Sequence, residues 1–169
     1  MISMEGKRVL ITGGAVRTGA VLCHAFARRG ASVTLHCLSS VREAEALRAI
    51  LPHPERHSIA VCDLSDPERA ADMIRNAGEL DVLVNNAACW LKNPTPADAA
   101  RQLRVNCASP VAMIREFARR AVSDDACAIN ILDQIVFRPA DEDPSPYAES
   151  KRALMRATRE LALELAPAV

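Results

Sequence analysis

Aromatic residues, net charge and long apolar runs are all scarce in this sequence. Phe, Trp and Tyr make up only 3% of the 169 residues, and 21 Lys and Arg residues are balanced by 21 Asp and Glu residues. This balance gives no electrostatic reason to expect binding to nucleic acid or to an anionic membrane. No stretch is long and apolar enough to cross a bilayer. We therefore expect a soluble protein whose partner is a small-molecule substrate, with no nucleic acid and no membrane partner.

A recognisable cysteine framework is also lacking. The six cysteines are scattered, with no C-x-x-C pair and no Cys/His cluster at zinc-ligand spacing. Scattered cysteines of this kind are typical of reduced core positions in cytosolic proteins. The first residues, up to Arg8, lack the apolar segment of a signal peptide. The sequence thus predicts a cytoplasmic protein without a metal site.

The sequence does have enough apolar residues, half of the total, for the core of one domain of this length. Short β-branched segments alternate with longer amphipathic segments along nearly the whole chain, which indicates a parallel sheet with helices on both faces. The expected strands are 8–12, 32–37, 57–62, 82–84 and 128–132. The expected helices are 18–29, 41–51, 67–77, 96–121 and 147–165. The predicted fold class is α/β, a doubly wound parallel sheet in a single domain over 1–169.

A glycine-rich turn, T-G-G-A-V-R-T-G at 12–19, joins the first expected strand to a helix. Such a unit lets backbone N–H groups and the positive helix end approach a pyrophosphate. An arginine near a helix start is unfavourable unless an anion lies close. The residues expected to bind a dinucleotide here are Thr12, Gly13, Arg17, Thr18 and Gly19. A tight turn that needs glycine only for its backbone geometry is the alternative.

The end of the second expected strand carries no carboxylate. An NAD-selective site would place Asp or Glu here, on the ribose hydroxyls of the adenosine. The sequence instead offers His36, Ser39, Ser40 and Arg42, and the two serines and the arginine could receive a 2′-phosphate by hydrogen bonds and charge. NADP(H) is therefore the expected cofactor in preference to NAD(H).

Tyr147 and Lys151 lie four residues apart at the start of the last expected helix, and therefore on one face of it. An ammonium group near the phenol favours the phenolate form. A hydroxyl tuned in this way can pass a proton to the atom that becomes basic as hydride arrives. Taken alone, Y-x-x-x-K is also typical of a surface helix pair.

Four motifs follow one another in a characteristic order. They are T-G-x-x-x-R-x-G at 12–19, D-L at 63–64, N-N-A at 85–87 and Y-x-x-x-K at 147–151. This set resembles the short-chain dehydrogenase/reductase family. The resemblance implies a Rossmann-type fold with a cofactor-binding half over 1–90, a catalytic half over 91–169, and an oxidoreductase activity that depends on a nicotinamide cofactor.

Three positions resemble the pteridine reductase branch of that family. Arg17 replaces the middle glycine of the turn, Asp133 stands where most members carry the catalytic serine, and Trp90 follows N-N-A-x-x. The resemblance implies that Arg17 and Trp90 orient a flat substrate ring, Trp90 by offset stacking. It also implies that Tyr147 donates a proton and Asp133 relays protons to it. The leading hypothesis is NADPH-dependent reduction of a dihydropterin-like or dihydrofolate-like ring. The alternatives are a general carbonyl reductase and a non-catalytic NADP-binding protein.

The resemblance assigns further cofactor contacts. Asp63 and Leu64, after the third strand, would meet the adenine. Asn86 and Ala87, after the fourth strand, would support the sheet beside the nicotinamide. A purely structural Asp63 that caps the turn before the next helix is the alternative.

Proton transfer would involve Lys151 and Asn106. The resemblance implies that Lys151 binds the nicotinamide ribose and that Asn106 organises a water-mediated proton path through this lysine. Asn106 could equally kink its helix by bonding the backbone. Likewise, Trp90 could pack beneath its own loop, and Asp133 could be a plain loop residue.

The family normally continues beyond the Tyr-Lys helix with a strand, a substrate-covering segment and a last strand, whereas this sequence ends at Val169. We expect the last strands of the fold to be missing, either because the chain is a fragment or because it is a natural short form. An open sheet edge invites pairing with another chain, and the resemblance implies assembly through segments 96–121 and 147–165. A homo-oligomer is expected. The acidic, proline-rich loop 139–146 either covers the site or is a solvated connector.

Overall fold

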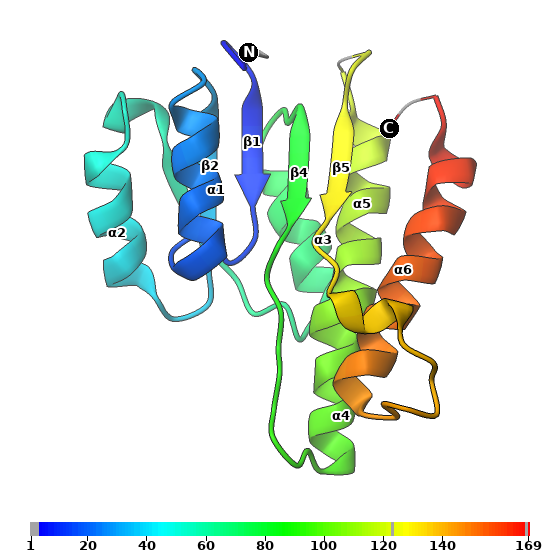
Figure 1. Ribbon diagram of the computed structural model, residues 1–169. Coiled ribbons are helices and arrows are strands. Elements are labelled where there is room, and N and C mark those ends of the chain that lie inside the picture. Colours follow the sequence, from blue (N-terminus) through cyan, green and yellow to red (C-terminus); the bar gives the residue numbers. More distant parts are fainter. Residues whose placement is uncertain (1–3, 123, 168) are drawn as a thin grey trace.

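The computed structural model describes residues 4–122, 124–167 and 169. Within them, five parallel strands form one sheet in the order β3-β2-β1-β4-β5 (Figure 1). The strands are β1 (Arg8–Ile11), β2 (Ser32–Cys37), β3 (Ser58–Val61), β4 (Val82–Asn85) and β5 (Cys127–Asn130). The α-helices are α1 (Arg17–Ala27), α2 (Val41–Ile50), α3 (Pro67–Asn76), α4 (Pro96–Leu103), α5 (Ser109–Arg120) and α6 (Pro146–Leu165). Two short 3₁₀ turns, η1 (Pro54–Arg56) and η3 (Gln134–Phe137), and a π-helical turn, η2 (Arg104–Ala108), complete the chain.

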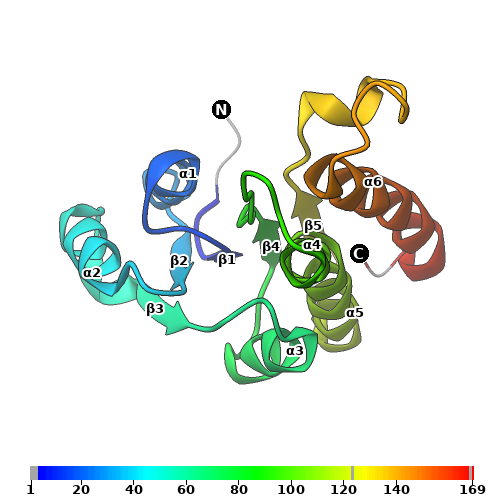
Figure 2. The ribbon, with the colours of Figure 1, turned by 90° about the horizontal axis from the view of Figure 1, so that it is seen from below.

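The helices cover both faces of the sheet, as the alternating pattern predicted. Seen along the strands, α1 and α2 lie on one face and α3 and α5 on the other, while α6 lies next to α5 at the β5 end (Figure 2). The α/β class, the parallel sheet and the doubly wound arrangement are thus confirmed. β1 pairs with both β2 and β4, so the chain changes winding direction between β1 and β4. Doubly wound folds bind ligands at this switch point, beyond the carboxyl ends of the strands.

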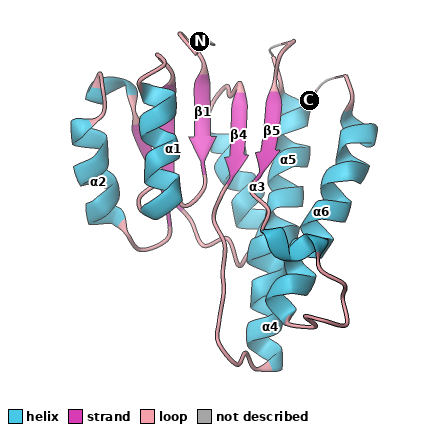
Figure 3. Ribbon diagram, in the orientation of Figure 1, coloured by secondary structure: helices cyan, strands magenta, loops and turns pink. Residues whose placement is uncertain are grey.

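The expected helix over 96–121 forms, and residues 96–120 are helical without a break (Figure 3). It is not a regular α-helix throughout, because the π-helical turn η2 lies between α4 and α5. Pro110, the second residue of α5, has no N–H to donate to the carbonyl of Asn106 four residues earlier. π-Helical turns of this kind occur frequently at functional sites, and Asn106 lies within this one.

The core lies on both sides of the central strands. Leu10 and Leu83 are fully buried and pack on the α3 and α5 side with Phe117. Val9 and Ile11 point the opposite way, into the cluster beneath α1. This strict alternation fixes the register of β1 against its neighbours, and so fixes where the strand ends and the glycine-rich turn begins.

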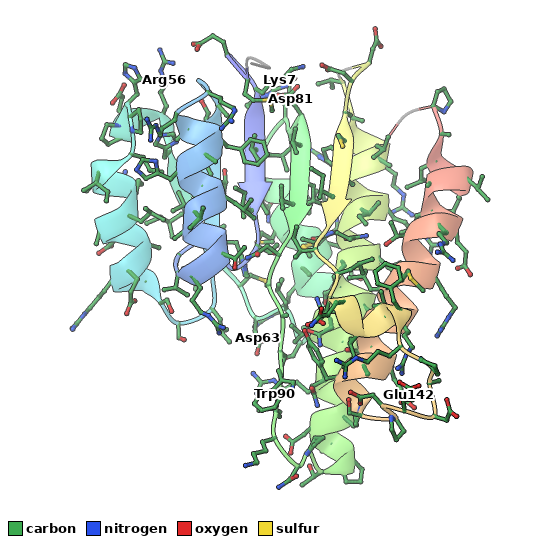
Figure 4. All side chains as sticks on the ribbon, viewed as in Figure 1. Lys7, Arg56, Asp63, Asp81, Trp90 and Glu142 are labelled. Carbon is green, nitrogen blue, oxygen red and sulfur yellow. The ribbon has the colours of Figure 1, made fainter. Side chains whose placement is uncertain are left out.

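At the amino ends of the strands, Asp81 binds the start of β1. Its Oδ2 accepts hydrogen bonds from the Arg8 backbone N–H and Nε, both at 2.8 Å, and its Oδ1 accepts one from the guanidinium at 3.1 Å. Asp81 is 5% exposed, and its hydrogen bond to Arg8 lowers the pKa of its carboxyl group. Figure 4 shows Asp81 at the opposite end of the sheet from Asp63 and Trp90.

Replacing Asp81 with Asn is expected to lower the free energy of unfolding by about 2 kcal/mol at neutral pH, since hydrogen bonds from a charged donor are broken. Because the folded pKa is depressed, this contribution is present above the unfolded pKa of about 3.9 and is lost as pH falls through the folded value. Urea unfolding at neutral and at acid pH tests this: the difference between wild type and variant should shrink in acid. Asp72→Asn, which breaks an exposed pair with Arg75, is the control and should change stability by less than about 0.5 kcal/mol.

None of the helices in the described part of the chain combines the length and the apolar character that crossing a bilayer requires.

Candidate active site

A cavity of about 550 Å³ opens at the carboxyl ends of the central strands. It is lined by twelve of the predicted site residues: Gly13, Arg17, Thr18, Gly19, His36, Leu64, Asn86, Ala87, Trp90, Asp133, Tyr147 and Lys151. The predicted site residues outside its lining are Thr12, Ser39, Ser40, Asp63 and Asn106. The fold therefore brings the glycine-rich turn and the Tyr-Lys helix to one cavity, although they are far apart in the sequence.

Thr12 and Asn86 tie the glycine-rich turn to the end of β4. Thr12 is 1% exposed, and its Oγ1 accepts hydrogen bonds from the backbone N–H groups of Asn86 at 2.9 Å and Ala87 at 3.0 Å. The Asn86 side-chain amide donates to the carbonyls of Thr12 at 2.9 Å and Gly13 at 3.3 Å. Both side chains thus hold the turn in place beside β4, and direct contacts of theirs with a cofactor remain a prediction.

The turn itself has the close backbone approach that glycine allows. Gly13 has a φ of +63°, in the region that side chains disfavour. Gly19, at the start of α1, has no room for a side chain because a Cβ would lie 1.9 Å from the Gly13 carbonyl oxygen. The helix start is therefore packed directly on the turn, with its first N–H groups at the cavity.

Arg17 occupies a strained position at the cavity. Its φ is +52°, in the left-handed region, where a residue with a side chain costs roughly 1–2 kcal/mol. The side chain is exposed and lines the cavity beside Thr18 and Gly19. An arginine held in a conformation that suits glycine, next to a helix start, favours the interpretation that its charge serves a bound anion.

His36 has a structural position beneath the turn. It is 2% exposed, its Nδ1 accepts a hydrogen bond from the Gly13 N–H at 3.1 Å, and its Nε2 lies 3.0 Å from the Cys62 carbonyl. The proton therefore sits on Nε2, and burial lowers the pKa of the ring. His36 is a neutral link between the turn and the end of β3.

Ser39 and Ser40 lie beyond the cavity because the chain turns into α2 at Val41. Leu38, 48% exposed, lines the cavity in their place, and sequence reasoning missed it. The sequence after β2 offered polar residues as cavity-lining candidates, and no feature of it indicated that the apolar Leu38 would line the cavity. Arg42, on the exposed side of α2, also lies outside the lining.

Asp63 caps its own turn, which was the structural alternative. Its Oδ1 accepts a hydrogen bond from the Ser65 N–H at 2.8 Å, and this bond lowers the pKa of the carboxyl group. The next residue, Leu64, is buried at the cavity wall. Contact of Asp63 with an adenine remains a prediction.

Trp90 does not pack beneath its own loop, so that alternative is wrong. The indole side chain is 63% exposed and lines the cavity. Figure 4 shows it on the extended segment that follows β4, beyond the ends of the strands. An exposed indole at a cavity mouth can stack on a planar ligand.

Tyr147, Asp133 and Lys151 form the polar centre of the cavity. The Tyr147 hydroxyl donates to Asp133 Oδ2 at 3.0 Å, and Lys151 Nζ donates to the Ile131 carbonyl at 2.9 Å. Burial, together with the hydrogen bond and charge of Asp133, raises the pKa of Tyr147 to about 12. Burial lowers the pKa of Lys151.

The expectation that Lys151 favours the phenolate is therefore wrong for this arrangement. Asp133 is the partner of the hydroxyl, and a carboxylate beside a buried phenol stabilises its neutral form. Asp133 also begins η3, since its Oδ1 accepts a hydrogen bond from the Ile135 N–H at 3.0 Å. Asp133 therefore has both a structural role and a contact with Tyr147. With its pKa raised, Tyr147 is protonated at neutral pH.

Asn106 connects three parts of the site. It is 1% exposed; its Oδ1 accepts from the Cys89 N–H at 2.7 Å, and its amide donates to the Cys89 carbonyl at 2.8 Å. The same amide donates to Ser150 Oγ at 3.0 Å, and Ser150 donates to the Tyr147 carbonyl at 2.7 Å. The Asn106 side chain thus bonds backbone groups, as its structural alternative expected, but they belong to Cys89 and not to its own helix. A water-mediated proton path that involves Asn106 remains a prediction. Ser150 was missed, because its role depends on a contact with a residue 44 positions away.

Among the described residues, no group of three or more His, Cys, Asp and Glu side chains is placed to hold a metal ion.

Comparison with known proteins agrees with this geometry. Residues 7–169 match the family described as short chain dehydrogenase. The D-xylose 1-dehydrogenase of Caulobacter vibrioides is 32% identical over 172 residues, which cover 98% of this chain and 68% of that protein. The chain spans about two thirds of the length of the curated relatives it matches.

Solved structures show the same fold. A short chain dehydrogenase from Burkholderia cenocepacia in complex with NADP has a TM-score of 0.88 at 30% identity, over 98% of this chain and 71% of that chain. BdcA in complex with NADPH has a TM-score of 0.84 at 27% identity, over 96% of this chain and 66% of that chain. The pteridine reductase branch remains a prediction.

Proposed function

This chain belongs to the short-chain dehydrogenase family, and from that premise we propose that it is an NADP(H)-dependent oxidoreductase acting on a small carbonyl compound or alcohol. The observation that carries the proposal is the meeting of Tyr147, Lys151 and the glycine-rich turn at one cavity. Relatives of similar sequence include a sugar dehydrogenase, which favours chemistry at a C–O bond.

The residues present fit a dinucleotide. Gly13 and Gly19 let the turn pack directly against the end of β4 and the start of α1, an arrangement in which backbone N–H groups can approach a pyrophosphate. Arg17 brings positive charge to the same wall. The end of β2 presents Leu38 rather than a carboxylate, which supports NADP(H), and related structures hold NADP and NADPH. The bound cofactor would supply or accept the hydride.

The chain's own residues would manage the proton. Tyr147 keeps its proton at Oη because Asp133 accepts the hydrogen bond from it, so the hydroxyl can donate to the substrate oxygen as that atom becomes basic. Lys151 is fixed by the Ile131 carbonyl, one helical turn from Tyr147, where we propose that it binds the nicotinamide ribose. Asn106 and Ser150 hold the helix that carries both groups.

A planar nitrogen heterocycle, such as a dihydropterin, is a second candidate substrate. The supporting observation is that exposed Trp90 and Arg17 line the same cavity as the Tyr147–Asp133 pair. An indole face and a cation suit a flat, polar ring, and a carboxylate beside the phenol suits proton delivery to nitrogen.

The test is NADPH oxidation by the purified chain, followed by loss of NADPH absorbance, with a panel of ketones, aldehydes and a sugar, and separately with dihydrobiopterin. Turnover of carbonyl compounds alone supports the first candidate, and turnover of the pterin alone supports the second. NADPH binding without turnover of any substrate contradicts both and indicates a non-catalytic NADP-binding chain.

A further inference from the structure

Arg152, the residue after Lys151 on α6, is buried although it carries a charge. Only 7% of it is exposed, and arginine is rarely buried without hydrogen bonds to its guanidinium. Nη1 donates to the Asp143 carbonyl at 2.9 Å, while Nη2 lies 3.3 Å from the Pro139 carbonyl and 3.4 Å from that of Arg138. All three acceptors belong to the loop 138–145, between η3 and α6.

The loop joins two elements that each carry a member of the polar centre. The element before it, η3, is capped at its far end by Asp133. At the other, Ser145 caps α6, and Tyr147 is the second residue of that helix. The loop therefore sets the distance between the Tyr147 hydroxyl and the Asp133 carboxylate, which meet at 3.0 Å although they are 14 residues apart.

Much of the loop 138–145 is exposed to solvent, so the hydrogen bonds from Arg152 are important for holding it in place. Residues 138–142 are all exposed, and Figure 4 shows Glu142 on the outer side of the loop. A solvated segment with few buried apolar contacts opens easily. Within the loop, Asp143 accepts a hydrogen bond from the Ser145 N–H at 3.0 Å, so the Arg152 bond to Asp143 reaches the cap of α6 directly.

We propose that Arg152 is a positioning residue: by closing the loop 138–145, its guanidinium holds the Tyr147 hydroxyl against the Asp133 carboxylate. The role of this contact in proton transfer rests on the proposed function, whereas the contact itself does not. The charged group that bears on the hydroxyl is Asp133, which caps η3. Lys151, one turn along α6, donates to the Ile131 carbonyl.

The single tyrosine of the chain makes the contact measurable. Tyrosinate absorbs in the near ultraviolet, so a spectrophotometric titration reports Tyr147 alone. Burial and Asp133 raise its pKa to about 12, and wild type should therefore form little tyrosinate before alkaline unfolding, which circular dichroism detects. Arg152→Ala frees the loop, exposes the phenol and loosens its contact, so its tyrosine should titrate near the free value of about 10.

Three further variants calibrate the result. Asp133→Asn removes the carboxylate and shows the shift expected when the contact is abolished. Arg156→Ala removes an exposed arginine one turn further along α6 and should titrate as wild type. Arg152→Lys keeps the charge but reaches fewer of the three carbonyls, so it should give a shift in the same direction that is smaller. If Arg152→Ala does not fold, the lysine variant decides.

A folded Arg152→Ala or Arg152→Lys protein that titrates as wild type overturns the proposal. The titration needs no substrate, so it tests the role of Arg152 separately from the proposed function. If the tyrosine pKa falls in Arg152→Ala but the wild-type chain turns over no substrate, the proposed function is contradicted and the positioning role of Arg152 is still supported. If the chain does turn over, Arg152→Ala should lower kcat about 10- to 100-fold with the KM for NADPH unchanged, because Arg152 lies outside the cavity lining.

Discussion

Replacing Tyr147 with phenylalanine is expected to lower kcat for NADPH oxidation about 10³-fold and to leave NADPH binding intact. The ring keeps its place at the start of α6, so packing changes little. What is lost is the proton at Oη, which Asp133 keeps on the phenol. Measurement of kcat by loss of NADPH absorbance, and of NADPH affinity by quenching of Trp90, the single tryptophan, separates the two effects.

The pH dependence follows from the raised pKa of Tyr147. A proton donor is active while it is protonated, and a pKa of about 12 keeps this phenol protonated across the neutral range. Wild-type reduction should therefore show no loss of rate between about pH 6 and pH 9 that is due to Tyr147.

A Tyr147→Phe variant that keeps more than a tenth of wild-type kcat would show that another group or water delivers the proton.

The strands and the glycine-rich turn could be predicted from sequence because their signals are local. The apolar segment ending at Ile11, followed at once by T-G-G, places a buried strand and a tight turn without knowledge of distant residues. The order of the later motifs then places Tyr147 and Lys151 on the helix beside the cavity. These predictions depend on residues that are neighbours in the sequence.

The parts of the site that sequence reasoning missed depend on distant contacts. The direction of the Tyr147 pKa shift follows from burial and from Asp133, on the other side of a loop. His36 was predicted among the cofactor-binding residues, yet the Gly13 N–H and the Cys62 carbonyl occupy its two nitrogens, and burial lowers the pKa of its ring. The π-helical turn at Asn106 had a local signal in Pro110, which removes a donor, but the residue that Asn106 binds is Cys89, outside the helix.

Gly19→Ala is expected to abolish tight NADPH binding through a steric effect at the start of α1. The new Cβ would lie 1.9 Å from the Gly13 carbonyl oxygen and 2.8 Å from Asn86 Nδ2. Neither neighbour can yield easily, because the Gly13 N–H is bound to His36 and the Asn86 amide is bound to the turn. The helix start must therefore move away from the turn, which separates the N–H groups that are proposed to hold the pyrophosphate.

The expected size of the effect is a loss of about 3 kcal/mol in the free energy of unfolding and a roughly 100-fold weaker Kd for NADPH, because the displaced N–H groups no longer hold the pyrophosphate together. Gly78→Ala is the matched control, since no atom lies within 4 Å of its Cβ position; its φ of +75° should cost about 1 kcal/mol of stability and leave NADPH affinity unchanged. Urea unfolding and Trp90 quenching measure both quantities in both variants. A Gly19→Ala protein that binds NADPH as tightly as wild type would mean that the cofactor does not lie on this turn, because the turn and the helix start cannot both keep their places around an added methyl group.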